Sequence, residues 1–382
     1  MFAKRLENLH PYVPGEQPKD RDYIKLNANE NPFPPHESVA AAIKTAVTEK
    51  IEKLGLYPDP DSTELRKAIA DMLNETGGVL NTAKVSGNKC SPSEENKIPF
   101  SVTPDMIFCG NGSDEVLSFV FYTFFDSDRP LVLPEFTYSF YPVYCGYYNI
   151  PMNPIKLRED WTLDTEKMLS EANRTDSCTI FANPNAPTGI EIKPEDVAAM
   201  IRRAPKDRIF IVDEAYADFG KESCIPLLKE FDNLVIVRTF SKSLSFAGMR
   251  LGYVVSSPAL IKSIFTVKNS FNHFPVDFLA QTAGTASCKA AAYYAKNAAA
   301  IVQERDKFSA FLRKNGWFVI DSRTNFVFAK KDGHSGEEIY ETVKKAGILI
   351  RHFATKGIED FVRITIGTPE QMKKLSEVLG TL

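Results

Sequence analysis

Cysteine is scarce in this chain and is not arranged for a disulfide or zinc framework. The 382 residues contain six cysteines and no CxxC pair. Five histidines are present, and no HExxH motif occurs among them. Clustered cysteines or paired histidines would indicate a disulfide scaffold or a metal site, so their absence favours a cytoplasmic protein with reduced thiols and no metal.

Long hydrophobic runs and an excess of basic residues are also missing. The most apolar run, residues 116–125 (VLSFVFYTFF), is too short to cross a bilayer and predicts a buried helix. The first residues lack the apolar core of a secretory signal. The net charge of −3 gives no general attraction to nucleic acid or to an anionic membrane. We therefore expect no nucleic-acid or membrane partner.

The chain is long enough for more than one folding unit. Its hydrophobic content of 43% and charged content of 25% are ordinary for a globular protein. We expect an N-terminal arm over residues 1–35, a large domain over residues 36–275 and a small domain over residues 276–382. Short strands and helices alternate after Trp317, which indicates an α+β fold for the small domain.

Three apolar runs in the middle of the chain are each followed by polar residues. The runs cover residues 178–182, 208–212 and 234–240. They are nearly continuous in Ile, Val and Phe, as in strands of a parallel sheet that is buried on both faces. Asn185, Asp213 and Lys242 follow their carboxyl ends, where open α/β sheets bind ligands. The sequence thus predicts an α/β fold with a site where these side chains converge.

Lys242 is the residue around which this predicted site is organised. Ser241 and Ser243 flank it, and Arg250 follows eight residues later. A neutral lysine forms a Schiff base with a carbonyl, and nearby positive charge and partial desolvation favour the neutral form. The alternative is an exposed lysine in a polar turn, a common environment for this residue type. Asp213 follows an apolar run, so we expect it to be partly buried and to need a partner, which a protonated ring nitrogen would supply.

A glycine-rich turn is a candidate anion site. In residues 110–115 (GNGSDE), Gly112, Ser113 and Asp114 open a helix, where backbone N–H groups and the helix dipole attract negative charge. Serine and aspartate are also ordinary helix caps, so the turn alone leaves both interpretations open. Tyr138, after the next apolar run, either stacks on a flat cofactor or packs in the core.

Several other residues are candidates for substrate binding. Arg351 and Arg363 lie on short strands near the C-terminus, where a guanidinium either holds a carboxylate or phosphate or faces water. Tyr12 and Asn29 lie in the N-terminal arm among prolines that fix the backbone. The arm either binds a ligand or wraps around another domain or subunit.

Two local features precede the glycine-rich turn. Ser62 is expected to cap a helix that begins at Glu64. The segment from Thr76 to Thr103 is rich in Gly, Ser, Asn and Lys, and we expect a flexible surface insertion without chemistry of its own.

Taken together, the motifs resemble those of fold-type I aminotransferases that depend on pyridoxal phosphate, and in particular those of histidinol-phosphate aminotransferases. The motifs are LNANENP (Leu26 to Pro32), LYPDP (Leu56 to Pro60), GNGSDE (Gly110 to Glu115), NPNAPTG (Asn183 to Gly189), DEAY (Asp213 to Tyr216), SKSLSFAGMRLG (Ser241 to Gly252), TNF (Thr324 to Phe326) and VRITIG (Val362 to Gly367). The resemblance covers nearly the whole chain. It implies a large domain with a mostly parallel central sheet and a small C-terminal α+β domain.

The resemblance also implies roles for the residues near the cofactor. Lys242 forms the Schiff base with pyridoxal phosphate and later moves a proton between substrate and cofactor. Asp213 pairs with the ring nitrogen of the cofactor, Tyr216 hydrogen-bonds its phenolate oxygen, and Tyr138 stacks on its ring. The groups implied to hold the cofactor phosphate are Gly112, the backbone of Ser113 and Asp114, the hydroxyl of Ser241 and the guanidinium of Arg250.

The substrate site and the assembly follow from the same resemblance. Arg363 matches the arginine that binds the anionic group of the substrate. Tyr12 and Arg351 match positions associated with the phosphate of histidinol phosphate, and Asn29 is placed near them. Tyr57 matches a tyrosine that reaches into the neighbouring subunit's site, which implies a homodimer.

The implied reaction transfers an amino group from histidinol phosphate to 2-oxoglutarate in histidine biosynthesis, giving imidazole acetol phosphate and glutamate. An aromatic amino-acid aminotransferase and a threonine-phosphate decarboxylase are alternatives on the same fold. A cofactor-binding regulator without catalysis is disfavoured, because the first 35 residues contain no helix-turn-helix pattern and no basic cluster.

The sequence departs from the family pattern at two places. The family loop usually reads NNPTG, whereas Ala186 stands here in the position of the cofactor-contacting asparagine. We expect Asn185, one residue earlier, to replace it. The other departure is the insertion at Val85–Val102, which we expect to modify entry to the site or contacts between subunits.

Overall fold

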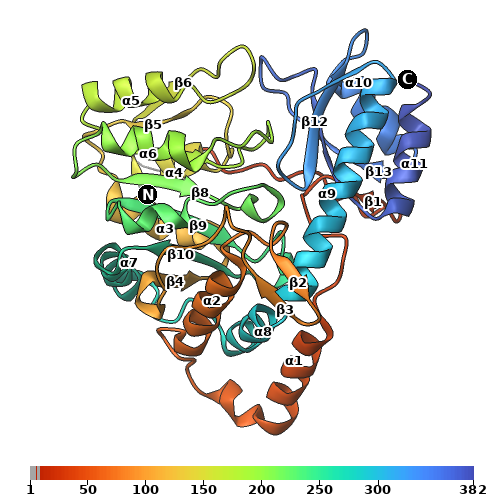
Figure 1. Ribbon diagram of the computed structural model, residues 1–382. Helices are drawn as coiled ribbons and strands as arrows, with labels where there is room; N and C mark the ends of the chain where they lie inside the picture. The colour runs from red at the N-terminus through yellow and green to blue at the C-terminus, as the bar shows by residue number, and fades with distance from the viewer. Residues whose placement is uncertain (1–5, 7–8) are drawn as a thin grey trace.

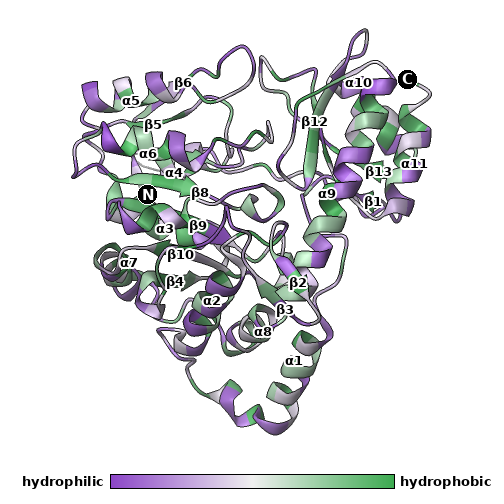
Figure 2. Cartoon of the chain, viewed as in Figure 1, coloured by the Kyte–Doolittle hydropathy of each residue, from purple (hydrophilic) through white to green (hydrophobic). Residues whose placement is uncertain are grey.

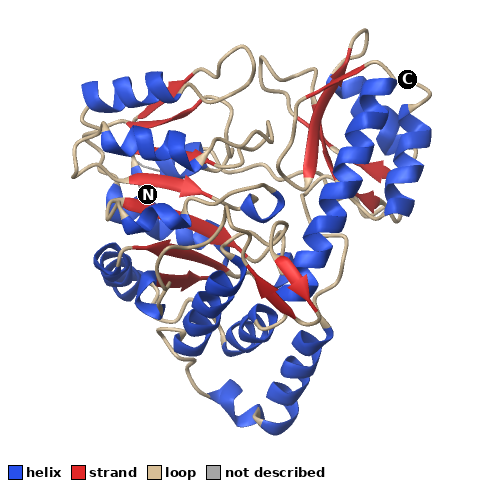
Figure 3. Ribbon diagram, in the orientation of Figure 1, coloured by secondary structure: helices blue, strands red, loops and turns tan. Residues whose placement is uncertain are grey.

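The computed structural model describes Leu6 and residues 9–382, so residues 1–5, 7 and 8 of the expected arm lie outside the described part. Its α helices are α1 (Glu37–Glu49), α2 (Thr63–Thr76), α3 (Gly112–Phe124), α4 (Tyr141–Tyr148), α5 (Thr165–Arg174), α6 (Pro194–Arg202), α7 (Pro258–Phe271), α8 (Phe278–Cys288), α9 (Ala291–Lys314), α10 (Gly336–Lys345) and α11 (Pro369–Leu379). These helices surround two main groups of strands and a short hairpin (Figure 3). Within the described residues, no helix is both long and apolar enough to span a membrane.

The larger part of the molecule is built around one sheet. Its described strands run in the order β4-β10-β9-β8-β7-β5-β6. Their bounds are β4 (Ile107–Gly110), β5 (Leu131–Pro134), β6 (Met152–Ile155), β7 (Thr179–Ala182), β8 (Phe210–Asp213), β9 (Leu234–Thr239) and β10 (Gly252–Ser256). β10 is antiparallel to β4 and β9, and the other neighbouring strands are parallel. The sheet is therefore mostly parallel, as the sequence predicts.

Alternate residues of the central strands enter two different cores. In β9, Leu234 and Ile236 pack in one core, whereas Val235 and Val237 pack in the other. Helices α2, α5, α6 and α8 supply the first core, and α3, α4 and α7 supply the second. Figure 2 shows apolar central strands and helices whose polar residues face outward. Because both faces are covered, the strands are apolar at consecutive positions, which explains the continuous runs in the sequence.

The C-terminal part contains a second, antiparallel sheet. Its strands run in the order β11 (Trp317–Val319), β12 (Phe326–Lys331), β15 (Val362–Thr365) and β14 (Arg351–His352). Helix α9 extends from the larger part into this one, where α10 and α11 lie beside it (Figure 1). The N-terminal arm also reaches it, because β1 (Ile24–Lys25) pairs in parallel with β13 (Ile348–Leu349). The arm thus passes the carboxyl ends of the central strands on its way between the two parts.

The structure differs from the sequence-based expectation at the start of α2. Ser62 has a left-handed backbone (φ 50°), and its side chain makes no capping hydrogen bond. Asp59 takes this role, because its carboxylate accepts hydrogen bonds from the N–H of Asp61 at 3.0 Å and of Thr63 at 2.7 Å. The cap lies three residues earlier than the sequence indicates, since the preceding turn directs the Asp59 side chain at the helix end.

The segment from Thr76 to Thr103 also differs from the expected open loop. It contains a hairpin of β2 (Lys84–Ser86) and β3 (Lys89–Ser91), which packs against α2 and α9. Asn96 is only 1% exposed, and Val102 is buried as well. The segment is therefore partly buried: several of its side chains face the larger core, although its overall composition is polar.

Candidate active site

Lys242 lies at the junction of two adjoining cavities beyond the end of β9. The sheet-side cavity, of about 230 Å³, is lined by Ser113, Asp114, Asp213, Ser241 and Arg250. The arm-side cavity, of about 190 Å³, is lined by Tyr12, Asn29, Arg351 and Arg363. Both cavities also touch Tyr138, Ala186, Tyr216 and Lys242. Most of the residues expected from the sequence therefore surround one continuous space.

The amine of Lys242 has few protein partners in this space. Its Nζ donates a hydrogen bond to the Ala28 carbonyl at 3.1 Å and lies 5.9 Å from the centre of the Tyr216 ring. The side chain of Asn31 fixes the backbone from the other side, because its Nδ2 donates to the carbonyls of Lys242 at 2.9 Å and Ser243 at 3.1 Å. The lysine is thus anchored by its backbone while its amine faces the cavities.

Asp213 ends β8 at the wall of the sheet-side cavity. One carboxylate oxygen accepts a hydrogen bond from the Tyr141 hydroxyl at 2.8 Å, and the other accepts one from the Ala215 N–H at 3.1 Å. Burial raises the pKa of Asp213 to about 6, although these hydrogen bonds oppose the shift. Removal from water destabilises its charged form, so a cationic group in the cavity would be strongly favoured there. A protonated ring nitrogen meets that requirement.

The other end of the sheet-side cavity suits an anion. The first turn of α3 presents backbone N–H groups at Ser113 and Asp114, and the Ser241 hydroxyl and Arg250 guanidinium lie in the same cavity. Arg250 pairs with Asp114 at 2.8 Å. Gly112 has φ 82°, a backbone conformation that favours glycine, and a Cβ there would lie 2.6 Å from an Arg250 nitrogen. This end provides the donor set that a phosphate group requires.

Tyr216 connects the site to the second sheet through Asn29. The Asn29 amide nitrogen donates to the Tyr216 hydroxyl at 2.7 Å, and its Oδ1 accepts from the Thr365 hydroxyl at 3.1 Å. Asn29 is buried and has a left-handed backbone (φ 54°). Both ends of its side-chain amide hydrogen-bond to protein groups. In this conformation Asn29 therefore serves mainly to orient Tyr216 and is less available as a hydrogen-bond donor to a ligand.

Two arginines make the arm-side cavity cationic. Arg351 and Arg363 are paired across β14 and β15, so their side chains lie on the same face of that sheet. Arg363 Nη2 donates to the Asn27 carbonyl at 3.2 Å, and Arg351 Nη2 donates to the Val13 carbonyl at 3.3 Å. Among the described residues, neither guanidinium has a carboxylate partner. Arg363 is half-buried, and burial lowers its pKa, so its charged form would gain from an anion.

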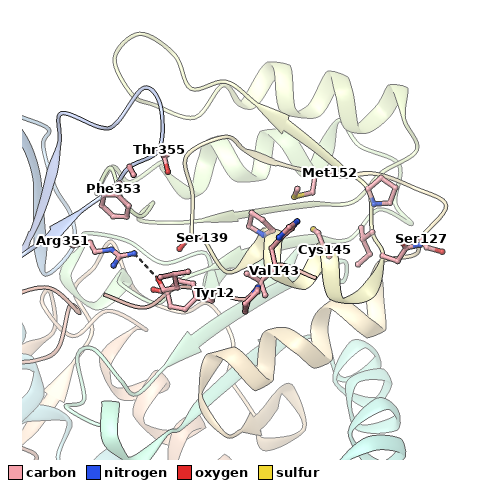
Figure 4. A pocket seen from close by; sticks show the side chains of 18 of the residues that line it. Tyr12, Ser127, Ser139, Val143, Cys145, Met152, Arg351, Phe353 and Thr355 are labelled. Carbon is pink, nitrogen blue, oxygen red and sulfur yellow. Dashed lines mark hydrogen bonds between the residues drawn. The ribbon is translucent and has the colours of Figure 1, made fainter. Parts of the chain in front are cut away.

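A larger groove of about 950 Å³ leads from the arm-side cavity to the surface. The two share Tyr12, Ser139, Arg351 and Phe353. Figure 4 shows Tyr12 and Arg351 close together at this boundary, with the hydrogen bond of Arg351 to the arm dashed. The groove continues past Val143 and Met152. The groove is open to Arg351, whereas Arg363 lines only the arm-side cavity.

Three residues expected at the site do not line either cavity: Gly112, which directly precedes the lining residue Ser113, and Asn185 and Tyr57. The Asn185 side chain is buried and donates to the Phe136 carbonyl at 2.9 Å and to the Thr188 hydroxyl at 3.0 Å. Ala186 lines both cavities instead. The Asn185 amide nitrogen thus points toward Phe136 and Thr188, and its contact with the cofactor stays a prediction. Tyr57 is 83% exposed and stacks on Phe274, with 4.6 Å between ring centres, far from the cavities of its own chain.

Sequence reasoning missed two residues that hold the site together. Tyr141 is the hydrogen-bond donor to Asp213, and Asn31 is the donor to the Lys242 backbone. Tyr141 lies in an aromatic-rich segment that reads as core packing, so no local signal separates it from its neighbours. Asn31 lies within the LNANENP motif, and the repeated asparagines of that motif could have indicated its role.

The family profile of class I and II aminotransferases matches residues 21–379. The chain belongs to this family. Within it, this aminotransferase is 46% identical over 383 aligned positions to a histidinol-phosphate aminotransferase of Syntrophus aciditrophicus (strain SB), covering 100% of this chain and 98% of the relative. It is 41% identical to histidinol-phosphate aminotransferase 1 of Bradyrhizobium diazoefficiens, covering 99% of this chain and 97% of the relative.

Solved structures show the same fold for this aminotransferase. Histidinol-phosphate aminotransferase from Sinorhizobium meliloti, in complex with pyridoxal 5'-phosphate, superposes with a TM-score of 0.83 at 23% identity, covering 100% of this chain and 96% of that one. An aspartate aminotransferase mutant of Thermus thermophilus superposes with a TM-score of 0.80 at 20% identity, covering 100% and 99%. The predicted family and fold class are confirmed.

Proposed function

We propose that this aminotransferase uses pyridoxal phosphate to transfer the amino group of histidinol phosphate to 2-oxoglutarate, in histidine biosynthesis. The observation that carries the proposal is the position of Lys242 between two cavities. The sheet-side cavity has a buried carboxylate at one end and anion donors at the other, and the arm-side cavity has two arginines without a carboxylate partner among the described residues. One end suits a phosphorylated pyridine, and the other suits an anionic substrate. Full-length relatives at 46% and 41% identity carry the histidinol-phosphate aminotransferase name and support this substrate.

The residues of the sheet-side cavity fit pyridoxal phosphate. When bound, this cofactor supplies a carbonyl for amine attachment and a ring that accepts electrons from the substrate carbon. Arg250, Ser241 and the first turn of α3 would hold its phosphate, and Asp213 would face its ring nitrogen. Tyr138 lines both cavities and donates to Asp114 at 2.9 Å, which places its ring beside the same space. Tyr216, oriented by Asn29, would face the phenolate oxygen.

The chain's own groups then perform three tasks in the reaction. Lys242 supplies the amine that takes up and returns the proton at the substrate carbon, because it is the lysine that opens into both cavities. Asp213 would stabilise positive charge on the ring nitrogen, because burial raises the pKa of this carboxyl and makes its charged form costly without a cation. Arg351 and Arg363 hold the anionic end of the substrate and thereby orient its amine toward Lys242.

We also propose that the enzyme is a cytoplasmic homodimer in which Tyr57 contributes to the neighbouring subunit's site. The support lies in exposed apolar side chains of the segment that directly follows α1, a part of the chain that protrudes from the body of the molecule (Figure 1). Ile51, Leu54 and Leu56 are 55%, 50% and 64% exposed. Such a contiguous apolar strip is typical of a surface covered in an assembly. All six cysteines are free thiols, which accords with a reducing compartment.

A half-reaction tests the proposed function. Purified protein is loaded with pyridoxal phosphate and mixed with histidinol phosphate in the absence of a keto acid, while the visible absorbance of the bound cofactor is followed. We expect the absorbance to shift to that of the amino form and to return when 2-oxoglutarate is added. A change with phenylalanine or tyrosine but none with histidinol phosphate would contradict the proposed substrate. An unchanged spectrum with every amine would contradict transamination itself.

A further inference from the structure

Behind the site lies a buried polar network that the proposed reaction does not use. Arg238 of β9 is 2% exposed, and its Nη2 pairs with Glu214 at 2.8 Å. Glu214 also accepts hydrogen bonds from the Cys224 N–H at 2.6 Å and the Ser223 hydroxyl at 2.8 Å. Burying an ion pair rarely increases stability compared with apolar packing, because both charges must leave water. The network therefore calls for an explanation other than stability alone.

One end of this network reaches the residue next to Lys242. Arg238 Nη1 lies 3.4 Å from Asp218 Oδ1, and Asp218 Oδ2 accepts a hydrogen bond of 2.5 Å from the Ser243 hydroxyl. Ser243 is 2% exposed, so this contact is shielded from bulk solvent. Asn31 holds the carbonyls of Lys242 and Ser243 from the arm, as described above. The backbone at Lys242 is thus held from two directions.

The other end of the network reaches the segment from residue 78 to residue 96. Arg238 Nη2 donates to the Gly78 carbonyl at 2.5 Å, and the Leu80 N–H donates to Asp218 Oδ1 at 3.1 Å. The same segment holds the backbone after Asp218, because the Asn96 side chain donates to the Lys221 carbonyl at 2.7 Å. This segment is the first part of the insertion to which the sequence assigned no chemistry.

We propose that Asp218 is a positioning residue for Lys242, and that the segment from residue 78 to residue 96 holds Asp218 in place. Lysine has a long flexible side chain, so its amine reaches a fixed point only if its backbone is fixed. A displacement of about 1 Å at a reacting group costs as much as about 100-fold in rate. The segment from residue 78 to residue 96 then affects the rate through Asp218 and Ser243, without contact with the substrate. This inference rests on the proposed role of Lys242.

Ser243→Ala tests the inner end of this network. We expect kcat for histidinol phosphate to fall about tenfold with the KM of both substrates within about twofold, because positioning affects the reacting group and leaves binding intact. Hydrogen exchange in residues 239–246, measured on the same protein, should become faster. The matched control is Ser270→Ala, because that serine is exposed and its hydroxyl bonds only within α7. Wild-type kcat and wild-type exchange in Ser243→Ala would overturn the inference.

Asp218→Asn and Asn96→Ala complete the test. Asp218→Asn should reproduce the loss of kcat and the faster exchange, and it serves in place of Ser243→Ala if that variant fails to fold. Asn96→Ala should give a smaller loss of kcat and the same direction of change in residues 239–246. An Asn96→Ala protein with unchanged exchange there would overturn the role of the insertion. If wild-type protein lacks transamination, the proposed function fails, whereas the exchange data still decide whether the network holds the Lys242 backbone.

Discussion

The two cavities that meet at Lys242 are built in different ways. The sheet-side cavity is formed by the carboxyl ends of β8 and β9 and the first turn of α3, so its groups stand on buried strands and a helix. The arm-side cavity is formed by the N-terminal arm, the loop after β5 and the small second sheet. Strands and helices hold functional side chains in fixed positions, whereas loops tolerate more sequence change. We therefore propose that the chemical step depends mainly on the sheet-side cavity and substrate selection on the arm-side cavity.

The largest expected effect comes from removing the group that the two cavities share. Lys242→Ala should lower kcat by about 10⁴-fold or more, because loss of a general acid–base group alone accounts for about 10²–10⁴. Steady-state transamination with histidinol phosphate measures this. Lys262→Ala, which changes an exposed lysine on α7, is the matched control and should retain wild-type activity. Residual activity within tenfold of wild type would assign the role of Lys242 to another group.

Asp213→Asn should separate catalysis from stability in the sheet-side cavity. We expect kcat to fall by about 10²–10³, as for loss of one preorganised electrostatic group. KM for histidinol phosphate should change little, because the arm-side arginines are intact.

The same variant should stabilise the protein without its cofactor at pH 7. The pKa of Asp213 rises from its ordinary value near 4 to about 6 in the folded chain, so the folded state binds this proton more tightly than the unfolded state. Its contribution to stability is therefore present below about pH 4 and is lost as the pH rises through about 6. Thermal unfolding of both proteins between pH 4 and pH 8 measures this. A lower Tm for the variant at pH 7 would contradict it.

Arg363→Gln should raise KM and leave kcat nearly unchanged, because it alters only the arm-side cavity. A charged hydrogen bond contributes about 1.5–3 kcal/mol, so the KM for histidinol phosphate should rise about tenfold to 100-fold. Arg129→Gln, at an exposed ion pair, is the control and should not alter KM. An equal loss in kcat would show that the two cavities are not separate in function.

The smallest expected effect lies outside both cavities, at the start of α2. Asp59→Ala should lower the free energy of unfolding by about 1 kcal/mol, because the carboxylate caps the helix, whereas Ser62→Ala should have almost no effect. Urea denaturation of both variants measures the difference. An equal loss of unfolding free energy in the two variants would contradict this and support Ser62 as the cap.

Much of the sheet-side cavity was predictable from the sequence, because it depends on local patterns. Asp213 and Lys242 end continuous apolar runs, and carboxyl ends of parallel strands share one edge of the sheet. Gly112 and Arg250 followed from the glycine-rich turn and the family motifs, and the structure brings them into contact.

Less of the surrounding support was predictable, because it depends on contacts between distant parts of the chain. Tyr141 meets Asp213 from 72 residues away, and Ser243 meets Asp218 only because the loops after β8 and β9 lie side by side. Asn185 follows its motif in sequence, yet its backbone turns the side chain toward Phe136. The direction of a side chain in a tight loop is set by packing that periodicity does not encode.

The most direct test of the account is to locate the lysine that binds the cofactor. Protein loaded with pyridoxal phosphate is reduced with borohydride, digested and analysed by mass spectrometry. The account predicts a phosphopyridoxyl group on the peptide that contains Lys242, and none when Lys242 is replaced by alanine. A modification on another lysine, or a Lys242 peptide that stays unmodified while the cofactor remains bound, would contradict it.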